Sequence, residues 1–274
     1  MPLPGNNGTK RDRGTVLVVG GSRRTPGAVL LAGTAALRVG AGTLQIAGPE
    51  SVATALAIHV PESLVLALPE TADGDVSSRA ADVLAELLDD AQSVLIGPGL
   101  HGAKESQPLV ASVLSRVGPQ TQVVLDAYGL RDLTPEVAAP VAGRLVLTPN
   151  ASEAAALLRR HADDMEDLLD AATVVAERFH AVVALHGNIA DPVAGRWVDE
   201  SGHAGLGTSG SGDVLAGLVA GLLARGAMPA QAACWGTHLH STAGERLAAR
   251  IGRLGFLARE LLDEAPLVLA ELQA

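Results

Sequence analysis

The sequence of 274 residues contains a single cysteine, Cys234. A lone cysteine cannot form an intrachain disulfide, and its isolation also excludes a cysteine cluster that would bind structural zinc. Proteins that use no disulfides fit a reducing compartment, so we expect a cytoplasmic protein.

Basic clusters and long hydrophobic runs are also lacking. The formal net charge is −10, and the arginines are scattered along the chain, so we expect no basic surface for a nucleic-acid backbone. The longest uncharged apolar runs, 25–37 and 214–224, are shorter than the roughly 20 residues that cross a bilayer. Residues 1–14 contain no apolar signal segment. We therefore expect a soluble protein that has neither nucleic acid nor a membrane as partner.

What the chain does contain is enough apolar material for a large core, with 48% hydrophobic and 18% charged residues. Its length is compatible with one large α/β domain or two smaller ones. Short β-branched or leucine-rich runs predict buried strands at 15–19, 43–47, 93–97, 122–127, 144–149 and 181–185. Helical periodicity predicts helices near 26–39, 51–58, 77–91, 107–117, 152–160, 165–179, 211–225, 229–249 and 257–272. This alternation indicates a parallel sheet covered on both faces, with ligands outside the carboxyl ends of its strands.

One glycine loop matches a dinucleotide fingerprint only superficially. GPGLHG at 97–102 is a literal G-x-G-x-x-G after a predicted strand, and Asp126 ends another strand further on. However, Pro98 removes a backbone N–H from the loop, and the polar AKESQP that follows is not expected to open a packed helix at once. The motif is also not the first turn of the fold, so a conventional Rossmann site is not favoured. The sequence has no G-x-x-x-x-G-K-[ST], which excludes a P-loop.

The stretch GTSGSGDVLAG at 207–217 is more specific. Its small residues can line a concavity with backbone N–H groups, and the helix that follows directs its positive end at the same spot. Asp213 is then either a carboxylate that stabilises a helix N-terminus or a base that takes a proton from a hydroxyl attacking a phosphoryl group. The apolar run after it indicates a buried helix whose N-terminus is held rigidly.

The chain resembles the ADP-dependent NAD(P)H-hydrate dehydratases of the ribokinase-like superfamily in an ordered set of segments: VVGGSRRTPGAVLLAGTAALRVGAGTLQIA, HVPESLV, GPGL, LDAYGL, LTPNASE and GTSGSGDVLAG. The resemblance extends from about Gly14 to the C-terminal GFLARELLDEAPLVLAEL. It implies a three-layer α/β/α ribokinase-like fold with a mostly parallel central sheet. We expect an N-terminal extension over 1–13 and a single domain over 14–274, without the epimerase domain that precedes this module in many fused relatives.

The resemblance also implies an activity. Members of the family are carbon–oxygen lyases that return hydrated NADH or NADPH to the active cofactor. ADP, or ATP in some members, drives the dehydration by phosphorylating the hydrate hydroxyl, which then leaves as phosphate. Mg²⁺ is expected with the nucleotide. The family further suggests a homo-oligomer, often a tetramer.

The resemblance assigns roles to individual residues. Asp213 is the catalytic base on the hydroxyl. The substrate site is expected to consist of Ala28, Gly99, Gly102, Asn150 and Asp213. The adenine nucleotide is expected at His186, Gly187, Asn188, Ile189, Ala190, Gly210, Ser211 and Gly212. Glu153 is expected to act on Mg²⁺ indirectly, through the nucleotide.

The chain departs from the family at several of these positions. Asn150 replaces a substrate-binding histidine, and TPNASE instead reproduces the N-x-x-E signature of sugar kinases with Glu153. His186 replaces a lysine, and a histidine carries less positive charge at pH 7. DAD becomes DAY, which introduces Tyr128, and GPGLG becomes GPGLHG, which introduces His101.

These departures leave two alternative functions open. One is a kinase of the same superfamily that acts on a sugar or a vitamin-precursor alcohol. The other is a catalytically silent nucleotide-binding homologue. Nothing in the sequence ties a residue to the 2′-phosphate that distinguishes NADPH from NADH, and nothing selects ADP or ATP.

Overall fold

The computed structural model describes residues 1–5, 8–161, 165 and 167–273. Within them, a nine-stranded sheet has the strand order β3-β2-β1-β4-β5-β6-β7-β8-β9. Its strands are β1 (Thr15–Val19), β2 (Thr43–Pro49), β3 (Ser63–Leu68), β4 (Ser93–Ile96), β5 (Gln122–Leu125), β6 (Leu145–Leu147), β7 (Val182–Leu185), β8 (Asn188–Asp191) and β9 (Gly195–Val198). All neighbours from β3 to β7 pair in parallel, whereas β8 and β9 pair antiparallel.

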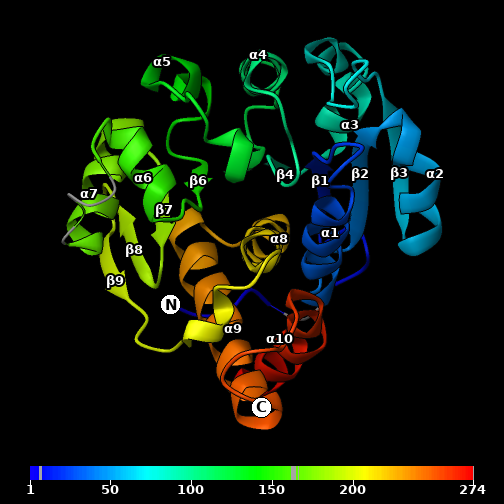
Figure 1. The fold of residues 1–274 in the computed structure, drawn as a ribbon. Helices are drawn as coiled ribbons and strands as arrows, with labels where there is room; N and C mark the ends of the chain where they lie inside the picture. The colour runs from blue at the N-terminus through cyan, green and yellow to red at the C-terminus, as the bar shows by residue number, and fades with distance from the viewer. Residues whose placement is uncertain (6–7, 162–164, 166, 274) are drawn as a thin grey trace.

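Helices cover both faces of the sheet (Figure 1). The α-helices are α1 (Gly27–Arg38), α2 (Glu50–His59), α3 (Ala85–Asp90), α4 (Ala103–Leu114), α5 (Pro135–Ala138), α6 (Ala151–Leu158), α7 (Leu168–Phe179), α8 (Ser211–Ala224), α9 (Pro229–Ile251) and α10 (Ala258–Leu272). Short 3₁₀ turns lie at Ser78–Asp82, Ala127–Gly129, Ala139–Val141 and Ala204–Leu206. In Figure 1, α4 and α5 lie on one side of the sheet and α8, α9 and α10 on the other.

The alternation of side chains along the strands divides the core into two layers. In β1, Val16 and Val18 pack with α1, α8, α9 and α10, whereas Leu17 and Val19 pack with α3, α4, α6 and α7. The strands β1, β2, β4, β5, β6 and β7 are buried on both faces and are accordingly apolar runs without a polar face, whereas β3 and β9 are partly exposed. The predicted three-layer α/β/α fold with a mostly parallel sheet is confirmed.

The six predicted strands are all present, with bounds shifted by up to two residues, but β3, β8 and β9 were not predicted. The expectation that AKESQP would not open a helix at once was wrong. α4 begins at Ala103, directly after Gly102, and carries Pro108 inside it. The helix tolerates these polar residues because most of them face solvent, and Ser106, which is buried, bonds through its hydroxyl to the Gly102 carbonyl at 3.1 Å.

α8 is the central helix of its layer and packs directly on α1 (Figure 1). A Cβ atom added to Gly217 would lie 2.1 Å from the carbonyl oxygen of Ala32, and one added to Gly221 would lie 2.6 Å from that of Ala36. The two backbones therefore touch, and only glycine permits this approach. Because both contacts repeat at a step of four residues, the same step places Asp213 opposite Ala28.

The N-terminal residues pack on the helical layer. The indole N–H of Trp235 donates to the Met1 carbonyl at 3.1 Å, and Arg225 donates to the carbonyls of Pro4 and Gly5. No helix within the described residues is long and apolar enough to span a membrane. The division of the chain at residue 13 stays a prediction.

Candidate active site

The site lies at the carboxyl edge of the parallel strands, where several loops are joined by hydrogen bonds. The loop after β1 donates from the Gly21 N–H to the Pro98 carbonyl, in the loop after β4, at 2.7 Å. The ends of β5 and β6 are joined by Thr148, whose hydroxyl donates to the Asp126 carboxylate at 2.9 Å. The N-terminus of α8 lies at the same edge, where the sequence places the candidate site, and the location of the functional site stays a prediction.

The start of α8 leaves backbone N–H groups open. Its first residue follows Gly210, which has the left-handed φ of +88° and supplies no side-chain cap. Among the described residues, the N–H groups of Gly212 and Asp213 have no acceptor, as is usual for the first turn of a helix. A Cβ atom on Gly212 would meet nothing within 4 Å, so the space in front of these groups is open. Open N–H groups at a helix N-terminus can bind an anion, so the geometry is compatible with the predicted anion site, which stays a prediction.

His240, on α9, holds the first residue of α8 in place. Its Nε2 atom lies 2.8 Å from the Ser211 hydroxyl and 3.0 Å from the Ser211 carbonyl oxygen. Burial lowers the pKa of His240 to about 4, against a smaller opposing effect of the hydrogen bond to Ser211. The imidazole is therefore neutral at pH 7 and acts as a hydrogen-bonding group. His240 was not among the predicted site residues, because nothing in its local sequence indicates its neighbour on α8.

Asp213 lies half-buried in the first turn of α8. Burial raises the pKa of its carboxyl to about 6. A carboxylate with this pKa is still mostly ionised at pH 7, and it is a stronger base than an ordinary aspartate. Position and basicity both suit the role of a group that takes a proton from a hydroxyl.

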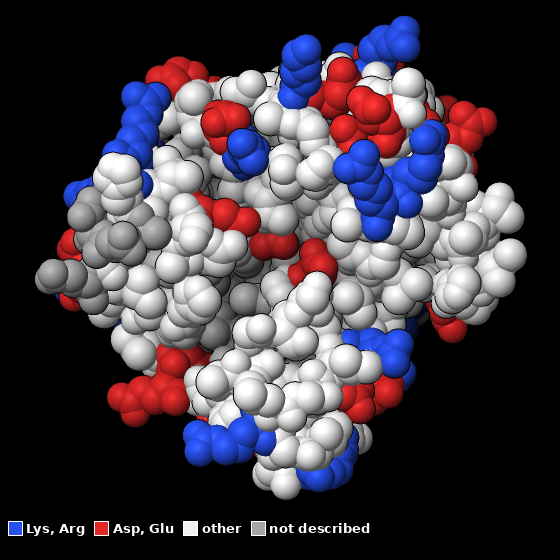
Figure 2. Space-filling model, viewed as in Figure 1, with Lys and Arg blue, Asp and Glu red and all other residues white. Residues whose placement is uncertain are grey.

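Two more carboxyl groups, Asp126 and Glu153, accompany Asp213. Asp126 ends β5 with only 5% of its surface exposed. Its pKa is raised to about 7, chiefly by burial and in addition by the charges of Asp213 and Glu153, against the opposing effect of the hydrogen bond from the Thr148 hydroxyl. Burial also raises the pKa of Glu153. Figure 2 shows acidic side chains gathered around the hollow at the centre of this face. Asp126 was not among the predicted site residues, although its position at a strand end was a usable signal.

Asn150 and Glu153 form a reciprocal cap at the start of α6. The Asn150 side-chain oxygen accepts from the Glu153 N–H, and the Glu153 carboxylate accepts from the Asn150 N–H, both at 2.9 Å. The N-x-x-E spacing that is typical of sugar kinases is therefore also a capping box. One carboxylate oxygen of Glu153 is left free of this pair.

A cavity of about 820 Å³ opens beside the N-terminus of α8. Its volume is within the usual range for a small-molecule site. Of the residues predicted to bind the nucleotide, His186, Gly187, Ser211 and Gly212 line it, as does Asn150. Thr237 also lines it, and the buried hydroxyl of Thr237 has no hydrogen-bond partner among the described residues. An unpaired buried hydroxyl is costly unless a ligand or water satisfies it, so it favours a polar ligand here.

His186 and Gly187, which line the cavity, form a two-residue hairpin turn between β7 and β8, with left-handed φ values of +47° and +81°. The other predicted nucleotide residues, Asn188, Ile189, Ala190 and Gly210, are not part of the cavity lining. The Asn188 amide donates to the carbonyls of Leu185 and His186 and so supports the turn. Ile189 and Ala190 are buried in β8 at 1% exposure each. Gly210 shapes the start of α8 against Leu31 and Ala258.

The predicted substrate residues Ala28 and Gly99 lie against each other. A Cβ atom on Gly99 would lie 2.8 Å from the Ala28 Cβ atom, and the Thr25 hydroxyl donates to the Gly99 carbonyl at 2.7 Å. Gly102 lies further along the loop, at the start of α4 and against Asp75. Two departures from the family meet beside them, because the rings of His101 and Tyr128 are 5.3 Å apart.

The acidic cluster cannot by itself enclose a metal ion. Within the described part of the chain, no three His, Cys, Asp or Glu side chains are placed to hold one. The free oxygen of Glu153 suits Mg²⁺, which takes one or two carboxylates and completes its shell with phosphates and water. The donor set therefore fits Mg²⁺ that arrives with a nucleotide.

Comparisons with known proteins agree with this geometry. The family model described as NAD(P)H-hydrate dehydratase matches residues 16–267. An ADP-dependent (S)-NAD(P)H-hydrate dehydratase from Xanthomonas campestris is 45% identical over 99% of this chain and 93% of its own. A bifunctional NAD(P)H-hydrate repair enzyme from Moorella thermoacetica is 39% identical over all of this chain, which spans 52% of that relative.

Solved structures give the same result. The ADP/ATP-dependent NAD(P)H-hydrate dehydratase of Bacillus subtilis, crystallised with ATP and Mg²⁺, superposes with a TM-score of 0.83 at 29% identity, over 99% of this chain and 94% of its own. A ribokinase from Thermotoga maritima, 16% identical with a TM-score of 0.60 over 92% of this chain and 99% of its own, shares the fold. The chain therefore belongs to the NAD(P)H-hydrate dehydratase family, within the ribokinase-like fold.

Proposed function

We propose that this protein dehydrates hydrated NADH or NADPH in a reaction driven by an adenine nucleotide. The observation that carries the proposal is the position of Asp213. It lies in the first turn of a buried helix, directly after Ser211 and Gly212, which line the 820 Å³ cavity. Because it lies one helical step of four residues before the Gly217–Ala32 contact, its register corresponds to that of Ala28 on α1. The 45% identical relative is named for ADP and for the S form of the hydrate, so we propose ADP and that epimer first.

Asp213 acts on the hydroxyl of the hydrate. The adenine nucleotide occupies the cavity lined by His186, Gly187 and Ser211, and its phosphates accept hydrogen bonds from the open N–H groups at the start of α8. The Asp213 carboxylate takes the hydroxyl proton while the hydroxyl oxygen bonds to the terminal phosphorus of the nucleotide. The bond from that phosphorus to its bridging oxygen breaks, which releases AMP from ADP or ADP from ATP. The phosphate ester then loses inorganic phosphate, which leaves with the electron pair of the carbon–oxygen bond. Loss of a proton from the adjacent carbon restores the ring double bond.

Glu153 is the residue we assign to Mg²⁺, through its free oxygen and with phosphate and water as the other ligands. A bound Mg²⁺ ion would neutralise part of the negative charge of the nucleotide phosphates. The acidic cluster of Asp126, Glu153 and Asp213 would otherwise repel the nucleotide. The chain's own contribution is to hold these carboxyl groups in a rigid, half-buried arrangement.

One assay tests the function. Purified protein is mixed with enzymatically prepared NADH hydrate or NADPH hydrate and with ADP or ATP, and recovery of the reduced nicotinamide absorbance is followed. Recovery that depends on the nucleotide supports the proposal. No recovery with either nucleotide, together with phosphorylation of a sugar or vitamin-precursor alcohol, would show the kinase alternative to be right. Binding of nucleotide and hydrate without turnover would show a silent homologue.

The kinase alternative rested on Asn150 and Glu153, and these residues also form a helix cap that needs no kinase activity. Its weight is reduced further by the 45% identity to a dehydratase over nearly the whole chain. A homo-oligomer, tetrameric by family resemblance, and a cytoplasmic location stay predictions. Sedimentation of the purified chain and its fractionation from cells would check them.

A further inference from the structure

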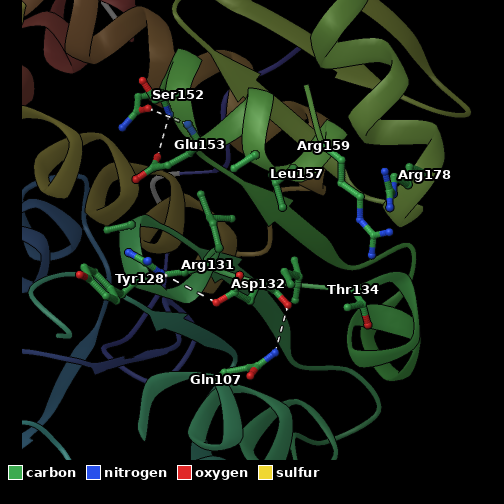
Figure 3. A pocket seen from close by; sticks show the side chains of 15 residues that line it. Gln107, Tyr128, Arg131, Asp132, Thr134, Ser152, Glu153, Leu157, Arg159 and Arg178 are labelled. Carbon is green, nitrogen blue, oxygen red and sulfur yellow. Dashed lines mark hydrogen bonds and ion pairs between the residues drawn. The ribbon is translucent and has the colours of Figure 1, made fainter. Parts of the chain in front are cut away.

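A second cavity, of about 850 Å³, adjoins the site. It is bounded by the loop after β5, by α6 along its length, and by Gln107 of α4 and Arg178 of α7, and Figure 3 shows its lining side chains. Asn150 and Glu153 line it at one end. Asn150 also lines the 820 Å³ cavity, so the two cavities meet at this residue. Two large cavities that share a wall suit a reaction with two large substrates.

The second cavity differs from the first in charge, because it is lined by Arg131, Arg159 and Arg178. Arg159 ends α6 in the left-handed conformation, with a φ of +57°, and Arg178 lies in the last turn of α7 over the Phe179 ring at 5.8 Å. In Figure 3 the side chains of Arg159 and Arg178 reach into the same part of the cavity.

Two of these guanidinium groups have no carboxylate of their own. Within the described residues, neither Arg159 nor Arg178 forms an ion pair, and Arg131 approaches only the Asp132 carboxylate, at 3.9 Å. The two are close enough to act on one carboxyl group, since both lower the pKa of Glu136, although the Thr134 side-chain hydrogen bond lowers it most. Unpaired guanidinium groups that converge are suited to a phosphate, which they bind with directed, charge-assisted hydrogen bonds.

We propose that this arginine cavity, defined by Arg131, Arg159 and Arg178, binds a phosphate group of the dinucleotide hydrate. The inference rests on the proposed function and extends it from the reacting ring to the distal part of the substrate. The molecule as a whole has a net charge of −10, and the carboxyl groups around Asp213 are also negative. A polyanionic substrate is therefore attracted electrostatically to the end of the site where Arg131, Arg159 and Arg178 face a cavity.

Tyr128 connects this cavity with the rest of the substrate site. Its ring packs at a tilt against the ring of His101, in the loop that contains Gly99 and Gly102, and its centroid lies 5.3 Å from the Arg131 guanidinium. Tyr128 also lines the arginine cavity. The dinucleotide can thus pass from Ala28 over Tyr128 to the arginines.

Two phosphates of the dinucleotide share this chemistry. The pyrophosphate is common to both hydrates, whereas the 2′-phosphate belongs to the NADPH form alone. The test therefore uses Arg159→Gln, Arg178→Gln and the double variant, with Arg196→Gln as matched control. Arg196 is an exposed arginine of β9 that lines neither cavity. The unreactive probes ADP-ribose and 2′-phospho-ADP-ribose are titrated by calorimetry, and the KM for each hydrate is measured.

We expect the double variant to weaken probe binding about tenfold or more and to raise KM by a similar factor, with a smaller change in kcat. A loss for both probes assigns the pyrophosphate, and a loss for the 2′-phosphorylated probe alone assigns the 2′-phosphate and a preference for NADPH hydrate. Wild-type affinity of the double variant for both probes would overturn the proposal, as would a wild-type protein that binds neither probe. A wild type that binds the probes but dehydrates neither hydrate would contradict the proposed function. The probe affinities of the variants would then still show whether the arginine cavity binds a phosphate group.

Discussion

At the scale of single residues, the site depends on carboxyl groups that lose part of their hydration. Burial raises the pKa of Asp213 to about 6 and that of Asp126 to about 7. Asp213 is the less buried and ionises first, and its charge then opposes the ionisation of Asp126. At pH 7 the cleft therefore holds an ionised base beside a carboxyl group that is partly protonated.

Replacing Asp213 by Asn tests its role as the base. The amide keeps the size of the side chain but cannot take a proton, so turnover should fall about 100-fold or more. The affinity for ADP, measured by calorimetry, should stay within a few-fold, because the lost group acts on the hydroxyl. Turnover like that of the wild type would show that another group is the base.

Asp126→Asn tests the cost of burying that carboxyl group. The pKa of Asp126 is higher in the folded protein than in the unfolded chain. Between about pH 4 and pH 7 the unfolded chain therefore binds fewer protons than the folded protein. The free energy of unfolding of the wild type consequently falls as the pH rises through this range. The amide oxygen can still accept from Thr148. At pH 8 the variant should therefore have a free energy of unfolding on the order of 1 to 4 kcal/mol above the wild type. At pH 4 the two should be similar, and a variant that is less stable at both pH values would contradict the account.

At the scale of secondary-structure elements, the position of Asp213 depends on how α8 lies on α1. Gly217 and Gly221 let the two backbones touch, and the neutral His240 binds Ser211 at the first turn. The helix is buried along its length, so its N-terminus has little freedom to shift. The preorganisation of the anion site is thus a property of helix packing.

Gly217→Ala should disturb this packing. The added methyl group would lie 2.1 Å from a backbone oxygen of α1, so the helices must separate, at a cost of about 1–3 kcal/mol in unfolding free energy. Turnover should fall as well, because Asp213 moves relative to Ala28. Gly27→Ala, at the start of α1 with nothing within 4 Å, is the control for stability. Chemical denaturation that gives equal stabilities for the two variants would rule out the tight contact.

The His186–Gly187 turn offers a test of the nucleotide cavity. His186→Lys introduces an ammonium group that is positively charged at pH 8, so ADP should bind about two- to fivefold more tightly. His180→Lys is the matched control, because His180 is also exposed and left-handed, with a φ of +48°, and lines neither cavity. Equal affinities of the wild type and the His186 variant would remove this residue from the nucleotide site.

The elements that sequence reasoning predicted and those it did not differ in burial. The buried parallel strands are apolar runs and were recognised, whereas β9 contains Gly195 and Arg196 at an exposed edge. The His186–Gly187 pair was assigned to the nucleotide by resemblance to the family, whereas its role as the hairpin turn before β8 was not predicted. Its assignment to the nucleotide stays a prediction. The roles of Ala28, Gly99, Asn150 and Asp213 came from resemblance and stay predictions. Ser211–His240 and the arginine cavity join residues far apart in the chain, which no local pattern reveals.

At the scale of the whole molecule, two cavities of 820 and 850 Å³ meet at Asn150, with the acidic cluster close to their junction. The account assigns the adenine nucleotide to the first cavity and the distal part of the dinucleotide to the second. The reacting ring is then brought to Asp213 between them. Both anionic substrates, the nucleotide and the dinucleotide hydrate, therefore bind side by side at one edge of the sheet. The positive charges of the arginines and the N–H groups at the start of α8 offset the repulsion between them.

The most direct test of this account follows the oxygen atom of the hydrate hydroxyl. NADH hydrate prepared in water enriched in a heavy oxygen isotope is treated with the protein and ADP, and the inorganic phosphate formed is examined by mass spectrometry. The account predicts that the label appears in the phosphate in proportion to the NADH recovered, because the hydroxyl oxygen leaves bonded to phosphorus. Recovery of NADH with unlabelled phosphate would contradict it, since the hydroxyl would then have left as water and Asp213 would not deliver it to a phosphoryl group.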